Sequence, residues 1–434
     1  MPVSRALIIG IIVVVIIIVG VAAYYLTRPP AVEKKIVVAT SWGGPEGEAF
    51  RAALDEFAKK YGVKVEIKQP KDMREYVLTQ LQSGQPEFDV AIVPWPHFVR
   101  ELGEKGLLAD VTDIVNKIKG DLISQYFVES VKTGGKYYAV PIKMWVKGLW
   151  VNKEALAKAG LSLDDIKTLE GFKAACKALK DAGIQPLVSG AADKWPLSDT
   201  FEAFIIRLGG PDLHQAMTHD PEAWKRPEVK EAFKLLAELL KEGCWGDPKV
   251  AIGEKWEAQV PKLAEGEAAM YFMGNWITLF IQTHAKEKGV DPSEYLSKVV
   301  YVLPPEIKPG LKPGVVGGGD WAIMPAKAPH PERAKKLMEW LAGPEYQELM
   351  VKRGGYLAVN VKVPKEAYTP ADYSVIETIK TYGAEILPDL DDNIVPSALQ
   401  LEIWNSLFEL WGNPDNWEDI YNRLVSTIET QMKG

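Results

Sequence analysis

Fourteen tryptophans stand among the 434 residues, and several lie next to side chains that hydrogen-bond well. Trp42 shares the segment SWGGPEG with Glu46, and Asp320 directly precedes Trp321 in VVGGGDWAIMP. An indole ring offers a flat apolar face and a single N–H donor, whereas a carboxylate accepts hydrogen bonds on both oxygens. Residues of these types placed in loops can hold a ligand that has flat apolar faces and a polar rim.

Motifs that perform catalysis or hold a cofactor are missing from the sequence. The GGGD segment lacks the lysine and hydroxyl residue of a phosphate-binding loop, and neither H-E-x-x-H nor G-x-S-x-G occurs. DLDDN, residues 389–393, is similar to part of a calcium loop but lacks its glycine and terminal glutamate. Acidic residues are numerous enough for a glycosidase pair, but no spacing selects one. We therefore expect no catalytic residues, no metal and no cofactor.

The N-terminal segment is set apart by its composition. Residues 6–26 carry no charge and, at about 1.5 Å per residue, are long enough to span the ~30 Å apolar core of a bilayer. A retained membrane anchor is the preferred interpretation. A cleaved signal peptide, whose apolar region is usually shorter, is the alternative. Residues 27–35 follow as a short, stiff linker.

Overall charge and cysteine content narrow the classes of protein further. A net charge of −7 and a pI near 5.5 argue against a general nucleic-acid binder, which usually needs a basic face. Two cysteines, Cys176 and Cys244, can pair outside the cell or remain free thiols, with Cys176 on an apparent helix face. The sequence leaves both possibilities open.

The elements that must position these residues follow an α/β pattern. Strands are predicted over residues 35–40, 63–67 and 88–93, and helices over 43–62 and 73–84. Alternating strands and helices indicate a parallel sheet, whose ligands gather beyond the carboxyl ends of the strands. The loops at those ends carry Trp42 and Trp95.

The second half of the chain adds long amphipathic helices and further strands. Strands are predicted over residues 268–274, 298–304 and 321–325, and the last part of the chain is mostly helical. A chain of this length is too long for one ordinary core, so two or more compact units are expected.

The ordered segments resemble the extracellular solute-binding proteins of ABC-type sugar importers, the maltose-binding-like group known as family 1. The resemblance covers residue 35 to the C-terminus, and its most specific piece is GVVGGGDWAIMPAKAPHPERAKKLMEWLAGPEYQELM. Segments similar to the family's opening strand and loop, third strand and aromatic loop, crossover, and cleft-aromatic strand occur in the family's order, at residues 37–67, 85–113, 134–156 and 263–277.

The resemblance implies an α/β, two-lobed periplasmic-binding-protein fold, in which each lobe is a mostly parallel sheet flanked by helices and the ligand lies between the lobes. Residues 1–34 would be the anchor or signal with its linker. The N-terminal lobe would comprise residues 35–142 with about 304–344, and the C-terminal lobe residues 143–303 with about 345–434.

The resemblance also implies which residues contact a sugar. Aromatic rings would stack on its faces, and charged groups and His97 would bond its hydroxyls. The glycines before Asp320 would let the backbone pass close to the ligand. The predicted ligand-binding residues are Trp42, Glu46, Trp95, His97, Lys143, Trp145, Trp195, Trp276, Gly319, Asp320, Trp321, Tyr356 and Trp404.

Plain structural roles compete with several of these assignments. Glu46 suits a helix N-terminus, where a negative charge is favoured. Trp404 shares a helical stripe with Leu401 and Phe408, which is typical of core packing. Trp95 could also be a core residue, the glycine triplet could form a bend between lobes, and Asp89 is expected to be structural.

The function that the resemblance implies is a high-affinity receptor that binds a sugar, with an oligosaccharide as the expected ligand, and delivers it to an ABC import permease without catalysing a reaction. It would act as a monomer on the outer face of the cell membrane, or as a secreted protein if residues 6–26 are cleaved. The alternatives are a protein of the same fold that binds a polyamine or another solute and, less favoured, a carbohydrate-active enzyme.

Overall fold

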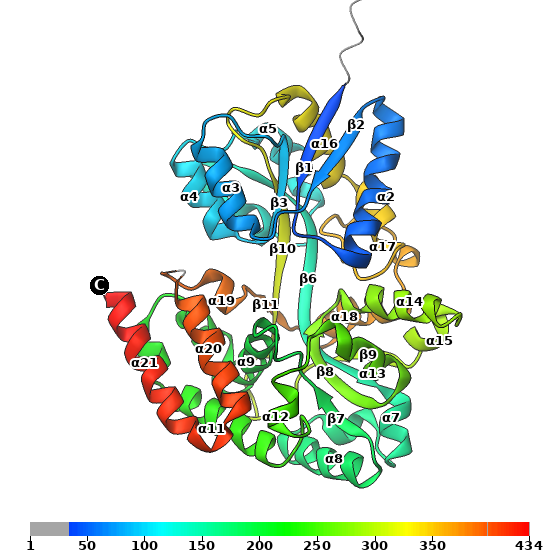
Figure 1. Cartoon of the computed structure of the whole chain (residues 1–434), viewed down its shortest axis with the longest axis vertical. Coiled ribbons are helices and arrows are strands. Elements are labelled where there is room, and N and C mark those ends of the chain that lie inside the picture. Colours follow the sequence, from blue (N-terminus) through cyan, green and yellow to red (C-terminus); the bar gives the residue numbers. More distant parts are fainter. Residues whose placement is uncertain (1–33, 397, 434) are drawn as a thin grey trace, which may run out of the picture.

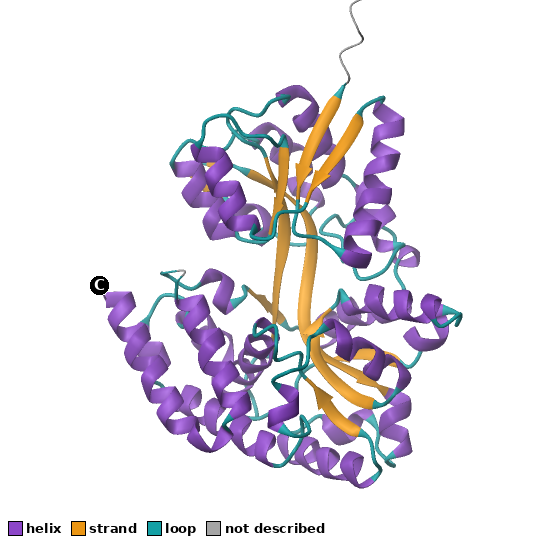
Figure 2. Ribbon diagram, viewed as in Figure 1, coloured by secondary structure: helices purple, strands orange, loops and turns teal. Residues whose placement is uncertain are grey.

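Two long strands, β6 (Ala139–Asn152) and β10 (Gly314–Ile323), join two α/β lobes in the computed structural model, which describes residues 34–396 and 398–433 (Figure 1). The strands pair antiparallel from Gly317 opposite Val146 to Ile323 opposite Ala139. Every residue of both strands is buried. The two strands therefore form a shared spine, with one lobe built on each end (Figure 2).

The N-terminal lobe extends the spine with three parallel strands. Their order is β2-β1-β3-β10-β6, where β1 is Lys35–Ala39, β2 is Lys64–Lys68 and β3 is Val90–Val93. The strands predicted near these positions are thus confirmed. The helices of this lobe are α2 (Gly44–Tyr61), α3 (Met73–Gln82), α4 (Pro96–Glu104), α5 (Thr112–Ile118), α6 (Tyr126–Glu129), α16 (Pro331–Ala342) and α17 (Pro344–Val351), with a small hairpin of β4 (Lys132–Thr133) and β5 (Lys136–Tyr137).

Helix α2 shows how the sequence pattern produces this lobe. Phe50, Leu54 and Phe57 recur at helical spacing and are buried against the sheet. Gly62 ends the helix with φ +61°, a left-handed conformation that glycine adopts without steric cost. The helix start places Glu46 at its first turn, beside the carboxyl end of β1.

The C-terminal lobe is built on the other end of the spine. Strand β6 continues beside β8 (Ala268–Gly274) and β9 (Val299–Val302), β7 (Gln185–Val188) flanks β8, and β11 (Glu385–Leu387) pairs with β10. Its helices are α7 (Lys153–Lys158), α8 (Leu169–Asp181), α9 (Trp195–Ala216), α10 (Pro221–Trp224), α11 (Pro227–Lys241), α12 (Pro248–Ala251), α13 (Val260–Glu265), α14 (Ile277–Glu287), α15 (Pro292–Leu296), α18 (Pro370–Tyr382), α19 (Leu390–Asn393), α20 (Leu399–Gly412) and α21 (Trp417–Lys433).

The points where the chain changes lobe differ from the expected residues 304 and 344. Lys308 N donates to Arg207 O of α9, so the chain just after β9 still packs on the C-terminal lobe. Helix α17 packs on the N-terminal lobe, with the Tyr346 ring 6.2 Å from that of Phe50. The chain touches the C-terminal lobe again at Gly355, whose carbonyl oxygen accepts a hydrogen bond from Asn275 Nδ2, and it packs on that lobe in α18, where Ser374 Oγ accepts one from Tyr301 N of β9.

The three glycines before Asp320 lie inside β10 rather than in a loop. A Cβ on Gly318 would come within 2.4 Å of the Trp145 ring, and one on Gly317 within 2.6 Å of Ile386. The expected role of these glycines, a close approach of backbone to ligand, is therefore wrong. They make room for side chains of the protein that pack against the spine.

The structure bears differently on the predicted membrane anchor and on the two cysteines. The predicted anchor, residues 6–26, lies outside the described residues. Within the described residues no helix is both long enough and apolar enough to cross a bilayer. Cys176 and Cys244 are both buried free thiols in this structure.

Candidate ligand-binding site

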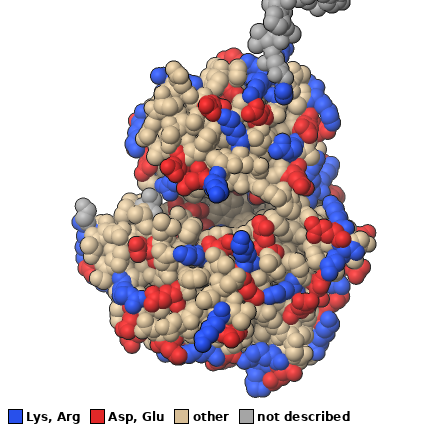
Figure 3. All heavy atoms as spheres, in the orientation of Figure 1, with Lys and Arg blue, Asp and Glu red and all other residues tan. Residues whose placement is uncertain are grey.

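A cavity of about 600 Å³ lies between the two lobes and is lined by residues of both. Figure 3 shows the hollow between the lobes, with acidic side chains on its inner left side, where Figure 1 places α19. The lining residues are Ser41, Trp42, Gly43, Gly44, Glu46, Pro94, Trp95, Lys143, Trp145, Lys147, Trp195, Trp256, Glu257, Trp276, Phe280, Asp320, Asp389, Asp391, Asp392, Gln400 and Trp404.

Strand β6 supplies a row of three side chains to this cavity. Successive residues of a strand point to opposite faces, so Lys143, Trp145 and Lys147 share one face. All three line the cavity. The row crosses from one lobe to the other, and each lysine lies among carboxylates of a different lobe.

Lys143 belongs to the N-terminal lobe, where its side chain is 3% exposed. Lys143 Nζ bonds the Glu46 carboxylate, lies 3.8 Å from Asp320 Oδ2, and sits 5.0 Å from the centre of the Trp42 ring. Burial would lower the pKa of Lys143, but the charges of the two carboxylates outweigh it and the pKa is raised. Burial raises the pKa of Asp320 to about 6, against the opposing effect of the lysine.

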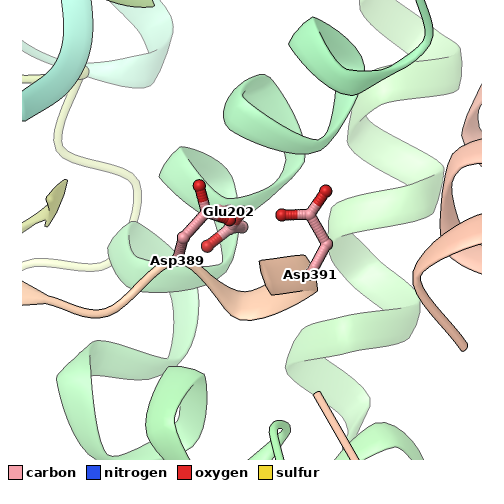
Figure 4. A group of neighbouring side chains, drawn as sticks. All are labelled: Glu202, Asp389 and Asp391. Atoms are coloured by element: carbon pink, nitrogen blue, oxygen red, sulfur yellow. The ribbon is translucent and has the colours of Figure 1, made fainter. Parts of the chain in front are cut away.

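The second lysine belongs to the C-terminal lobe and faces a larger set of acids. Lys147 Nζ lies 2.6 Å from Asp199 Oδ1 of α9 and also bonds Asp389. These two buried acids cluster with Glu202 and Asp391, which are also buried, and with the half-buried Asp392. We call Asp199, Glu202, Asp389, Asp391 and Asp392 the C-lobe acid group. Figure 4 shows three of its members turned toward one another, and their carboxylate oxygens lie within 4.8 Å.

Burial changes the protonation of this group. It raises the pKa of Asp199 to about 7 and that of Asp392 to about 7, and it raises the pKa of Asp391 as well. The pKa of Asp389 is lowered, because Lys147 outweighs the effect of burial on it. Burial also lowers the pKa of His214, whose Nε2 lies 2.6 Å from Glu202 Oε2, to about 4, so this imidazole is neutral at pH 7.

Aromatic rings form a continuous wall on the side of the C-terminal lobe. The ring centres of Trp195 lie 5.8 Å from those of both Trp256 and Trp276. Trp256 in turn lies 4.8 Å from Phe280, and Trp276 lies 6.4 Å from Trp145. We call these five rings the aromatic row. Trp42 and Trp95 face the same cavity from the N-terminal lobe.

The structure brings nine of the thirteen predicted residues to the cavity. These are Trp42, Glu46, Trp95, Lys143, Trp145, Trp195, Trp276, Asp320 and Trp404. The other four, His97, Gly319, Trp321 and Tyr356, are not among its lining residues.

Trp321 is placed in the interior because it neighbours Asp320 on a strand. Since Asp320 faces the cavity, the next side chain must point to the opposite face. Trp321 is 0% exposed, and its Nε1 donates a hydrogen bond of 2.7 Å to Phe127 O. The prediction that Trp321 supplies a face to the ligand is therefore wrong. Gly319 packs against the same phenylalanine ring.

The remaining two predicted residues make contacts within the protein. His97 lies on α4, with Nδ1 3.2 Å from Arg100 and Nε2 3.2 Å from Glu101. Tyr356 is 1% exposed, donates its hydroxyl hydrogen to Ile142 O, and lies beneath the ammonium of Lys143 at 5.7 Å. Tyr356 therefore positions the lysine rather than lining the cavity. Asp89 is structural as expected, since it accepts hydrogen bonds from Val37 N and His330 N.

Several lining residues were missed at the level of sequence. The alternation of β6 could have identified Lys147 once Lys143 and Trp145 were chosen. The acids of α19 stand in the DLDDN segment, whose sequence indicates at most part of a calcium loop. Trp256 and Phe280 carried no local signal, because only the folding of distant segments brings them to the cavity wall.

Comparison with known proteins gives a consistent family for the chain. The family model described as bacterial extracellular solute-binding protein matches residues 41–348. An uncharacterized ABC transporter extracellular-binding protein of Pyrococcus horikoshii is 31% identical over 393 residues, which cover 88% of this chain and 86% of that protein.

Two more similarities bear on the ligand and on the fold. An alpha-glucosides-binding periplasmic protein of Rhizobium meliloti is 26% identical, covering 74% of this chain and 72% of its own. The solved structure of a chitin oligosaccharide binding protein superposes with a TM-score of 0.78 at 20% identity, covering 92% of this chain and 99% of that one. The similarity to this solved structure supports the two-lobed fold.

Proposed function

Because the chain belongs to the bacterial extracellular solute-binding protein family, we propose that it is the sugar receptor of an ABC importer. It captures an oligosaccharide between its lobes and delivers it to a membrane permease. The observation that carries this proposal is the inter-lobe cavity, in which indole rings from both lobes stand beside buried, charged hydrogen-bonding groups.

The chemistry of the cavity suits a sugar. A pyranose ring has apolar C–H faces, which the aromatic row, Trp42 and Trp95 can cover, and hydroxyls that carboxylates and lysines can bond. Aromatic contacts add roughly 0.5–1.5 kcal/mol each beyond area burial, and hydrogen bonds to ionised groups about 1.5–3 kcal/mol. A few of each reach the ~8 kcal/mol of a micromolar complex after the cost of association.

The known relatives favour the same ligand class. The Rhizobium meliloti relative is named for binding alpha-glucosides, and the chitin oligosaccharide binding protein is named for an oligosaccharide. The number of rings around the cavity also favours an oligosaccharide over a single sugar, since one pyranose has only two faces.

The proposed chemistry is reversible binding alone. The cavity carboxylates closest to the spine are held by Lys143 and Lys147, and an acid so paired is poorly placed to donate a proton to a glycosidic oxygen. Incubating the protein with oligosaccharides and measuring new reducing ends tests this part. We expect no new reducing ends. Hydrolysis of an oligosaccharide would show that the protein is an enzyme and would contradict the receptor proposal.

The family is extracellular, and we propose that residues 6–26 hold the protein, as a monomer, on the outer face of the membrane. Expression of the full chain and of a chain starting at residue 34 tests this. The full chain should partition into membranes and the shortened one should not. Equal partitioning would remove the anchor from the proposal.

A polyamine receptor of the same fold is the second candidate. The observation that favours it is the excess of acids in the cavity lining, where six acidic residues face two lysines. A polyamine needs several carboxylates around apolar surfaces, and the lining offers both.

A thermal-shift screen across mono-, di- and oligosaccharides, with putrescine and spermidine beside them, separates the two candidates. A ligand present at about 100 times its Kd should add about 2.7 kcal/mol of stability. We expect the melting temperature to rise with at least one saccharide. A flat response to every saccharide together with a rise for a polyamine would reverse the assignment.

A further inference from the structure

We propose that the saccharide bound by this protein carries a protonated amino group, and that this group is seated against Asp391 and Asp392 at the α19 end of the cavity. The inference rests on the proposed sugar-receptor function and narrows its ligand to aminated saccharides.

The first support is the unequal ratio of acids to lysines in the two lobes. In the N-terminal lobe Lys143 is matched by Glu46 and Asp320. In the C-terminal lobe the acid group has five members. Among the described residues, Lys147 is the only lysine or arginine that forms an ion pair with it. His214 adds no charge at neutral pH, because burial keeps it unprotonated. Burial and the neighbouring Asp389 raise the pKa of Asp391 and Asp392, so these carboxyls hold protons that an ammonium brought by the ligand would displace.

The second support is hydrogen-bonding capacity that the protein leaves unused. Asp389 is 2% exposed and lines the cavity, yet its Oδ1 has no hydrogen-bond partner in the described part of the chain. Asp391 accepts from Trp404 Nε1, and Asp392 accepts from Gln400 Nε2 at 2.9 Å. A carboxylate can accept about four hydrogen bonds, so each of these acids retains room for further donors. Buried acceptors without a partner are unusual and favour an absent donor.

The third support is the aromatic surroundings of the acids. Trp145 and Trp195 lie at 5.2 and 6.0 Å from Lys147 Nζ, so the site already holds one ammonium against indole faces. Trp404, which bonds Asp391, lines the same end of the cavity. An ammonium over an aromatic face gains about 0.5–2 kcal/mol, the larger value when water is excluded. An amino group on a stacked sugar ring would meet both the acids and the indoles.

An inorganic cation fits these acids less well than an ammonium. Calcium takes six to eight oxygen ligands. Of the three acids whose oxygens cluster, Glu202 already accepts from Leu390 N at 2.8 Å and lies beside His214. Asp389 is bonded to Lys147, so a metal ion there would stand next to an ammonium. An ammonium at Asp391 and Asp392 displaces none of these partners.

The test is calorimetry of the full chain at about pH 6.5 with matched pairs of saccharides. Each pair shares its ring and linkage and differs only in the amine: chitosan against chitin oligosaccharides, and glucosamine, galactosamine and mannosamine against glucose, galactose and mannose. We expect at least one aminated member to bind ten-fold or more tightly than its neutral partner. The preference should weaken as salt is raised from 0.05 to 0.5 M.

Two variants locate the group that recognises the amine. Asp392→Asn should lower the affinity for the aminated ligand about ten-fold more than it lowers the affinity for its neutral partner. Asp415→Asn, on a side chain that is 84% exposed and away from the cavity lining, should change neither affinity. Equal losses for both members of a pair in Asp392→Asn would contradict a seat for an ammonium at this acid.

The outcomes separate this inference from the proposed function. Binding of neutral saccharides as tight as, or tighter than, that of their aminated partners would refute the amine and leave the sugar receptor standing. Binding of spermidine but of no saccharide would remove the sugar receptor as well. A rise in melting temperature with calcium alone would assign the acids to a metal. The absence of binding by every aminated saccharide contradicts the inference, whatever else binds.

Discussion

Lys143 and Lys147 stand four residues apart on one strand, point into one cavity, and serve opposite lobes. The first has two acids, one of which, Glu46, keeps 21% of its side chain exposed. The second bonds Asp199 and Asp389, whose side chains are 1% and 2% exposed. The same residue type on the same strand is thus a modest ion pair in one lobe and the centre of a dense buried acid group in the other. We infer from this contrast that the burial of the partner acids, and not the lysine itself, sets how much the stability of the protein depends on each lysine.

The largest effect expected from this contrast is on stability. Lys147→Met should lower the free energy of unfolding by about 3–5 kcal/mol at pH 8, because it leaves several buried carboxylates without a cation. Lys143→Met should cost less, about 1–3 kcal/mol, since water can reach Glu46. Chemical denaturation of both variants measures the difference. Equal losses, or a larger loss for Lys143→Met, would contradict the ranking of the two lobes.

A smaller effect tests how the spine positions the tryptophan between the two lysines. Gly318→Ala would place a Cβ 2.4 Å from the Trp145 ring, so the ring or the strand must shift, at a cost of about 1–3 kcal/mol. Gly120→Ala is the matched control, because nothing lies within 4 Å of a Cβ there. The melting temperature of the first should fall by several degrees and that of the second should stay nearly constant. If both variants melt alike, the packing argument for the glycines fails.

The smallest effect is a pH dependence that originates mainly in the C-terminal lobe. The pKa values of Asp199 and Asp392 are raised to about 7 from the ordinary value near 3.9. The folded state therefore holds these protons more tightly than the unfolded state. Their contribution to stability is complete below about pH 4 and is lost as the pH rises through about 7.

The measurable part of that dependence lies between pH 6.5 and 8. Below 6.5 His214, whose pKa is lowered to about 4, acts in the opposite direction, because the unfolded state then gains its proton. The melting temperature of the unliganded protein should thus be a few degrees higher at pH 6.5 than at pH 8. Asp392→Asn should reduce this difference. A melting temperature that rises between pH 6.5 and 8 would show that the acid group is ionised throughout.

The two lobes also differ in how far the sequence predicts them. In the N-terminal lobe the strands, the helix α2 and the loop tryptophans follow from local patterns, and Trp42, Glu46 and Trp95 all reach the cavity. The prediction for Trp321 is wrong because the predicted strand begins at residue 321, whereas β10 begins at Gly314 and includes Asp320, so that the two neighbours point to opposite faces.

The C-terminal side of the cavity is harder to predict because its acids do not stand in a loop directly after a predicted strand, as Glu46 does in the N-terminal lobe. The ion pair between Lys147 and Asp389 joins residues 242 positions apart, and the one between Lys147 and Asp199 spans 52. No periodicity or local motif encodes such a pair. The DLDDN segment shows only that several acids are adjacent in the sequence. Their contacts with Lys147 and with the tryptophan rings arise from the tertiary fold.

The measurement that tests the account most directly is calorimetric titration of one saccharide into three proteins: the wild type, Trp95→Ala from the N-terminal lobe, and Trp276→Ala from the C-terminal lobe. We predict one site per chain, an affinity at least ten-fold weaker in each variant, and recovery of the saccharide unchanged afterwards. Undiminished affinity in either variant, or two independent sites, would contradict a single ligand held between both lobes.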